Sequence, residues 1–159
     1  MIKKRIGLAF LCLFVCGCGA AISKSITPYQ FDAGTKLNLA LSKGAEVKIP
    51  EETFETIKSQ IAQGLSERHL LAATTNDNSR KAEINITSYQ MRSDAARLTV
   101  GIVAGCDNIK SNVTVFDTAA NQKIGESEIT IEECAAWGVS SQVIKKYCDG
   151  VVKFLAGEK

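Results

Sequence analysis

The sequence contains only one histidine, and none of its serines lies in the G-x-S-x-G pattern of a nucleophile elbow. It also has no glycine-rich phosphate-binding loop before an expected helix. His69 follows Arg68 where a helix is expected to end, a place that favours a positive side chain. Zinc or triad chemistry would need further ligands or partners nearby. The sequence therefore predicts no enzyme activity, no metal and no cofactor.

The chain also lacks a large excess of charge of either sign. Its 19 basic and 17 acidic side chains give a formal net charge of +2. Removal of an N-terminal signal containing Lys3–Arg5 would leave 16 basic side chains against 17 acidic ones. Nucleic-acid binding needs clustered lysines and arginines on one face, so nucleic acid is excluded as a partner. Glu126, Glu128 and Glu132 share one parity in an expected strand, which indicates a solvated face rather than a cation site.

No long apolar run is present near the N-terminus. The run from Ile6 to Val15 has about ten residues, and as a helix it would cover about half of a hydrocarbon layer about 30 Å thick. Basic residues precede this run and small residues follow it, which is the order of a secretory signal. Residues 1–17 are therefore predicted to be a signal peptide rather than a permanent membrane span.

Two cleavage routes fit the end of this signal. Val15, Gly17 and Cys18 resemble the lipobox of bacterial lipoproteins, although Cys16 stands where a small or hydroxylated residue is usual. Gly19-Ala20-Ala21 also offers a site for ordinary cleavage, which would release a soluble protein. We favour the first route because Cys18 lies where lipidation requires it. It predicts a cell-envelope lipoprotein with acyl chains such as palmitate on Cys18, and residues 18–35 form a flexible tether. The lipid bilayer and other envelope proteins are then the expected partners, and the domain faces the periplasm or the cell exterior.

The remaining residues, 36–159, are expected to form a single domain. Phe54, Ile57, Ile61 and Leu65 recur at helical spacing and predict an amphipathic helix over residues 51–68. The other expected elements are strands over 36–43 and 82–91, a buried strand with a glycine bend over 98–105, a hairpin of strands 108–117 and 123–133, and a helix from Ser140 or Ser141. Strands and helices do not alternate regularly, which favours an α+β fold with an antiparallel sheet and both helices packed on one face.

The register of the expected hairpin also predicts a disulfide. Pairing residues whose numbers sum to 240 puts the apolar residues of both strands on one face, whereas a one-residue slip would set Val113 opposite Glu126. Cys106 and Cys134 also sum to 240, so they are expected to lie opposite each other and to form a disulfide worth about 3 kcal/mol. Cys148 lies on the inward stripe of the last helix and is expected to be a buried free thiol.

Three aromatic residues are candidates for a recognition patch. Phe116 has the outward parity of the hairpin, and Tyr89 and Trp137 complete the set. Scattered surface aromatics are common, so such a patch would need the three side chains to gather on one face.

The segment that begins at Arg97 contains the glycine stretch GIVAG, the expected strand NVTVFD and the expected strand KIGE. With these features it resembles a family of small uncharacterised bacterial envelope lipoproteins with a domain of unknown function. Ala120 and Asn121 stand where that family usually has Thr and Gly. The resemblance implies an α+β envelope domain and supplies no activity. The leading hypothesis is a non-enzymatic accessory or binding domain, and the alternative is a secreted or periplasmic hydrolase with a pocket near His69 or Glu133.

Overall fold

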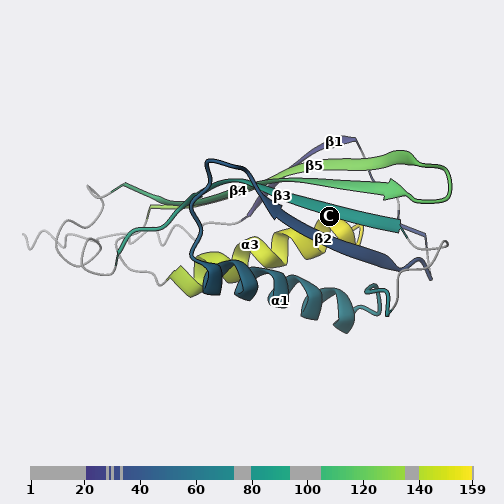
Figure 1. Ribbon diagram of the computed structural model, residues 1–159, viewed down its shortest axis with the longest axis horizontal. Coiled ribbons are helices and arrows are strands. Elements are labelled where there is room, and N and C mark those ends of the chain that lie inside the picture. Colours follow the sequence, from purple (N-terminus) through teal and green to yellow (C-terminus); the bar gives the residue numbers. More distant parts are fainter. Residues whose placement is uncertain are drawn as a thin grey trace, which may run out of the picture.

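The computed structural model describes residues 21–27, 29, 31–32, 34–73, 80–93, 105–134 and 140–158. Five strands form one sheet in the spatial order β1-β5-β4-β3-β2. The strands are β1 (Ile22–Thr27), β2 (Leu37–Lys43), β3 (Arg80–Gln90), β4 (Asp107–Asp117) and β5 (Gln122–Glu133), and the helices are α1 (Glu51–Glu67) and α3 (Ser140–Leu155). Figure 1 shows both helices on the same side of the sheet, and the contacts place α1 against α3. The α+β class is therefore confirmed.

The expectation of a purely antiparallel sheet is wrong, because β2 pairs with β3 in parallel. The chain leaves β2, passes through α1 and returns at the start of β3, and a helical crossover of this kind joins parallel strands. The pairs β3 with β4, β4 with β5 and β1 with β5 are antiparallel, so the sheet is mixed.

The prediction that residues 18–35 form a flexible tether is wrong for Ile22–Thr27, which form β1. This strand pairs with β5, and Ile22 is the partner of Thr130. Residues 22–26 are exposed, so the strand depends on backbone pairing rather than on a buried face. A strand with no buried face does not need alternating apolar residues. Because the sequence shows no such alternation here, it predicted a tether instead of a strand.

The hairpin register predicted from the apolar residues is confirmed through most of its length. The observed partners are Ile109 with Ile131, Ser111 with Ile129, Val113 with Ser127, and Val115 with Gly125. The register then shifts between Val115 and Phe116. In the turn, Asp117 Oδ1 accepts hydrogen bonds from the backbone N–H groups of Ala119 and Ala120, both at 3.0 Å. Asn121 completes the turn with a φ of 47°, a conformation that asparagine tolerates better than most residues.

The core lies between the helices and one face of the sheet. It contains the predicted stripe of α1 and the predicted stripe of α3, and Phe54 packs at its border. Its fully buried residues include Ile57, Ile61 and Leu65 of α1, Tyr147, Val151 and Leu155 of α3, and Ile84, Ile109, Ile129 and Ile131 of the sheet. Gly64 allows the helices to approach closely, because a Cβ there would lie 2.9 Å from Val152 Cγ2. The expected helices are therefore confirmed, and their apolar stripes form the core.

The described residues between Ala21 and Asp32, here called the N-terminal segment, pack against this body at three glycines. A Cβ on Gly150 of α3 would lie 2.7 Å from Ala21 Cβ, and one on Gly125 of β5 would lie 2.6 Å from Tyr29 Cβ. Beyond α3, a Cβ on Gly157 would lie 3.1 Å from the Cβ of the segment's second aromatic residue, Phe31. The contacts at Gly150 and Gly125 are too close for any other residue, and the φ of 69° at Gly157 favours glycine there. The sequence is therefore adapted to this segment's position.

Candidate functional site

A buried ion pair joins the end of β3 to the start of β4. The side chains of Arg92 and Asp107 are 4% and 3% exposed, and Arg92 Nη2 lies 3.2 Å from Asp107 Oδ2. The backbone N–H of Arg92 also donates to Asp107 Oδ1 at 2.7 Å, and Nη2 donates to the carbonyl oxygen of Glu133 at 3.2 Å. Arg92 therefore ties the ends of three neighbouring strands together.

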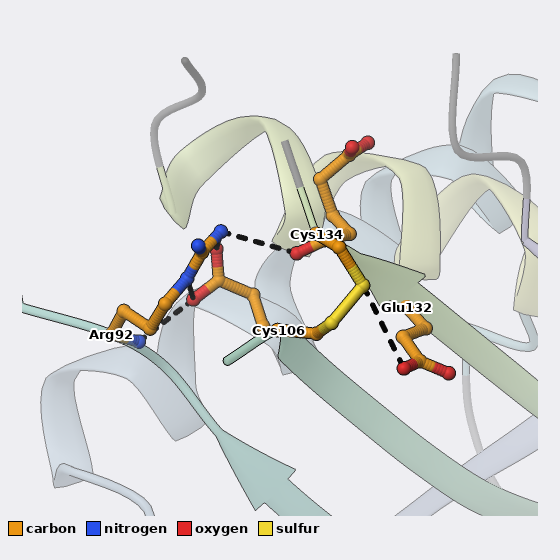
Figure 2. The surroundings of a disulfide bond; sticks show 6 residues. Arg92, Cys106, Glu132 and Cys134 are labelled. Atoms are coloured by element: carbon orange, nitrogen blue, oxygen red, sulfur yellow. Dashed lines mark hydrogen bonds and ion pairs between the residues drawn. A yellow bond between two sulfur atoms is a disulfide. The ribbon is translucent and has the colours of Figure 1, made fainter. Parts of the chain in front are cut away.

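A disulfide joins Cys106 and Cys134 at the same end of the sheet, as the hairpin register predicts. Their Cα atoms are 4.2 Å apart, and Figure 2 shows the bond next to Arg92. Glu132 Oε1 lies 3.8 Å from Cys134 Sγ. These three residues could form a metal-binding group by proximity alone. Because the sulfurs are bonded to each other, neither is available as the thiolate that a metal would need.

Glu133 connects this end of the sheet to α3. Its carboxylate Oε2 lies 2.9 Å from Lys146 Nζ, and its side chain is 11% exposed. The ion pair, the disulfide and this contact form what we call the stapled end: Arg92, Cys106, Asp107, Glu133, Cys134 and Lys146. These contacts hold the ends of β3, β4 and β5 and the helix α3 together, so the stapled end has a structural role.

Residues 94–104, which follow β3 in the sequence, and residues 135–139, which follow β5, lie outside the described residues. The expected strand over 98–105, except Gly105, falls there, as do Arg97 of the family resemblance and Trp137. Cys18 of the expected lipid anchor is likewise outside the described part of the chain.

Removing the disulfide is expected to destabilise the domain without changing its fold. The bond closes a loop with a sequence separation of 28 residues, for which the chain-entropy estimate gives about 3 kcal/mol. The variant C106A/C134A should therefore unfold at lower urea concentration than the wild type. Reduction of the wild-type protein provides the matched comparison. Equal midpoints for oxidised and reduced protein would contradict this role.

Cys148 is a buried free thiol, as its place on the apolar stripe of α3 predicts. Its Sγ lies 3.8 Å from the carbonyl oxygen of Ile57, and burial raises the pKa of the thiol to about 12. The thiol is therefore protonated at neutral pH, and it is inert because the thiolate is the reactive form.

The Cys148 thiol is expected to react slowly with a disulfide reagent in the native protein. A pKa near 12 instead of 9 lowers the thiolate fraction at pH 8 by about 10³-fold, and burial slows the reaction further. Stopped-flow labelling should show slow reaction in buffer and fast reaction in denaturant. The variant C148A is the blank in both conditions. Fast labelling of native wild-type protein would show that the thiol is accessible.

Tyr147 and Ser111 place two hydroxyl groups inside the apolar core. Burial raises the pKa of Tyr147, and the Ser111 hydroxyl is close enough to oppose part of that rise. The two hydroxyl groups nevertheless do not form a hydrogen bond with each other, and neither has another hydrogen-bond partner among the described residues. Both hydroxyl groups are therefore neutral groups within the apolar core.

The structure has two hollows beside α3. One, of about 370 Å³, lies between α1 and α3 and is lined partly by Gln60, Arg68 and Asp149. The other, of about 620 Å³, lies under β1 and is lined partly by Ser23, Lys153 and Glu158. Neither hollow is lined by His69 or Glu133, the residues around which a hydrolase pocket was expected.

His69 has a backbone role at the end of α1. It adopts a left-handed conformation with φ 56°, and its N–H donates to the carbonyl oxygen of Ser66 at 2.9 Å. Leu70 N–H donates to Leu65 O at 2.8 Å, which completes a Schellman motif. The expected position at the helix end is correct, and the backbone hydrogen bonds close the helix there.

The structure does not gather the three aromatic residues of the expected recognition patch. Tyr89 pairs with Ile109 on the helix-covered face and packs against the core. Phe116 has the opposite parity from the buried Val115 and lies on the open face. Tyr89 and Phe116 therefore face opposite sides of the sheet and share no patch. Trp137 lies outside the described residues.

The fold and the stapled end together define an α+β domain with a five-stranded mixed sheet, two helices on one face and a disulfide-linked strand end. A family profile described as "Domain of unknown function (DUF4410)" matches residues 24–136. The chain belongs to this family. No curated protein matches the sequence.

Solved structures with a similar fold share little sequence with this chain. A single-residue variant of PelC from Paraburkholderia phytofirmans, described as a dodecamer, has a TM-score of 0.57 and 9% identity, with 86% of this chain and 95% of that chain covered. Another PelC dodecamer structure from the same organism has a TM-score of 0.56 and 8% identity, covering 86% and 96% of the two chains. Protein XCC0632 from Xanthomonas campestris, of a family named DUF330, has a TM-score of 0.50 and 9% identity, covering 77% and 82%. At this identity the likeness concerns the fold alone.

The described helices include none that is both long and apolar enough to cross a membrane.

Proposed function

We propose that this protein is a bacterial cell-envelope lipoprotein, anchored through acyl chains on Cys18, whose domain has a non-enzymatic accessory or binding role. The observation that carries the proposal is the Cys106–Cys134 disulfide. Disulfides persist mainly in oxidising compartments outside the cytosol, so the bond supports export of the domain. Export also agrees with the signal over residues 1–17 and with the lipobox pattern that ends at Cys18.

The roles of the chemically capable side chains support a non-enzymatic domain. His69 closes a helix, and the Cys148 thiol is protonated and buried. Three glutamates of β5 have lysine partners within 3 Å, namely Glu126 with Lys123, Glu128 with Lys110, and Glu133 with Lys146. Groups that are committed to structural contacts are poor candidates for acid–base chemistry.

The fold neighbours support an accessory role that involves contacts with other proteins. PelC is described as a dodecamer, so a chain of similar fold can use its surface for assembly. Other envelope proteins, including further copies of this chain, are therefore the partners that we propose beside the lipid bilayer.

Metabolic labelling with a clickable palmitate analogue tests the anchor. The wild-type protein should be labelled, and the variant C18A should lose the label because the acylated thiol is gone. The variant C16A is the matched control, because it removes a nearby cysteine of the same signal and should remain labelled. Labelling that persists in C18A, or that is absent from the wild type, would contradict the proposal.

A further inference from the structure

Strand β1 carries the exposed apolar side chains of this domain. Ile22 and Ile26 are 69% and 57% exposed, and they are the large hydrophobic residues that stand out to solvent among the described residues. Both lie on an edge strand whose other side pairs with β5. Lys24 lies between them in the sequence. A bilayer interface has apolar acyl chains beneath charged headgroups. Two exposed isoleucines on either side of a lysine suit such an interface, because the isoleucines can contact the acyl chains while the lysine reaches the headgroups.

This edge is held firmly to the body of the domain. Ser23 Oγ lies 2.9 Å from Ser127 Oγ, which links the first residues of β1 to β5. The N-terminal segment also packs on the three glycines described above, from Ala21 to Phe31. Further along it, the Arg80 guanidinium bonds to Asp32 and donates to the Tyr29 hydroxyl at 3.3 Å. Packing against the body of the domain is therefore already present at Ala21.

The short distance from the anchor limits where β1 can lie. Three residues separate Cys18 from Ile22, so the two Cα atoms are four extended chain steps apart, at most about 14 Å. The headgroup layer on each side of a bilayer is about 5–8 Å thick. An acylated Cys18 therefore places Ile22 in or just above the headgroups. If β1 pointed away from the surface, Ile26 would be farther off by about 13 Å, since a strand rises about 3.3 Å per residue.

We infer that the bilayer itself is the partner of this edge: β1 lies flat on the membrane surface, with Ile22 and Ile26 in the headgroup region and Lys24 near the lipid phosphates. The inference rests on the proposed acylation of Cys18. It assigns an orientation to the domain. The β1 edge, where Ile22 and Lys24 project from the open face of the sheet as partners of Thr130 and Glu128, is nearest the lipid, and β2, at the opposite edge of the sheet, is farthest from it (Figure 1).

A second copy of the chain is the competing occupant of this edge. β1 is only six residues long, and its pairing with β5 is interrupted by an irregularity between Ser25 and Thr27. Short length, a bulge and an edge lysine are the features by which proteins discourage strand addition. The edge is therefore better suited to a lipid surface than to a continuous sheet between copies.

Lipid quenching of tryptophan fluorescence tests the orientation. The full lipidated protein, with the native tryptophan removed by W137F, carries one new tryptophan through I22W, I26W or S59W. It is reconstituted in phosphatidylcholine vesicles that contain phosphatidylcholine brominated near the top of the acyl chains. Tryptophan is suited to this interface, so I22W and I26W are conservative there. Ser59 is the control position, because it is exposed on α1 on the helix-covered side of the sheet.

Quenching should be several-fold stronger for I22W and I26W than for S59W. Equal quenching at the three positions, or quenching of I22W alone, would overturn the flat orientation. Weak quenching at both β1 positions together with a larger assembly in sedimentation would assign this edge to a second copy and also overturn it. Flotation with the vesicles tests the lipid anchor separately from the orientation of β1. Protein that floats but is not quenched at β1 contradicts the orientation alone, whereas protein that does not float contradicts the anchor as well.

Discussion

The variant I61D is expected to unfold the domain or to lower its free energy of unfolding by several kcal/mol. Ile61 is fully buried at the centre of the α1 stripe, between the other two buried residues of that stripe, Ile57 and Leu65. An aspartate there would put an unpaired carboxylate into an apolar environment, which costs far more than the loss of the isoleucine side chain alone. Because domains of this size have only about 5–15 kcal/mol of stability, one such change removes a large part of it.

The control for this variant is S59D on the exposed face of the same helix. It introduces the same charge two residues away and should change stability by less than about 0.5 kcal/mol. Urea denaturation followed by circular dichroism measures both variants. Equal midpoints for I61D and S59D would mean that α1 is not packed on the sheet.

The variant D107A is expected to cost about 3–5 kcal/mol, the usual effect of removing one partner from a buried ion pair. It would leave the Arg92 guanidinium in a site where its side chain is only 4% exposed, and it would also remove the acceptor of the Arg92 backbone N–H. The disulfide remains, so the loss should appear as a lower unfolding midpoint in oxidised protein rather than as a different fold.

The exposed pair of Lys145 and Asp149 on α3 provides the comparison. The two side chains lie 2.8 Å apart and are 70% and 56% exposed. Exposed pairs contribute about 0–1 kcal/mol, so D149A should have a small effect. If D107A and D149A had equal effects, the pair at the stapled end would not be structurally important.

The hairpin and both helices could be predicted because their apolar residues allow few alternatives. In the hairpin, a one-residue slip would put Val113 and Ile129 on opposite faces, and the register that keeps them on one face also placed Cys106 opposite Cys134. In α3, the spacing of the apolar residues is enough to predict that Cys148 is buried. Each of these elements buries a continuous stripe, so the pattern in the sequence and the packing in the structure have the same cause.

Two features of the sheet, the direction of the β2 pairing and the existence of β1, could not be predicted for physical reasons. The alternation in β2 indicates which residues face inward, but it contains no information about whether the neighbour runs parallel or antiparallel. The exposed β1 is stabilised by hydrogen bonds to β5, and its sequence ISKSIT has no buried face to reveal it. Backbone pairing leaves little trace in a single sequence.

The buried ion pair has a partial signal in the sequence. Asp107 has the same parity as Ile109 and Val113, so the register that paired the hairpin already directed its carboxylate inward. A carboxylate on a buried face requires a partner. The partner, Arg92, lies at the end of a strand, and nothing in its local sequence indicates burial. The sequence could therefore indicate the disulfide and the buried Asp107 of the stapled end, but it could not indicate Arg92.

Intact-mass analysis of the protein purified from the cell envelope is the most direct test of the central claim, that the domain is exported and anchored through Cys18. The account predicts a mature chain that begins at Cys18, carries acyl chains on that residue and contains the Cys106–Cys134 disulfide. Reduction should add two hydrogen atoms to the mass, and the Cys148 thiol should be unmodified. An unmodified N-terminus at Ile22, or a full-length chain from Met1 with all thiols free, would contradict it.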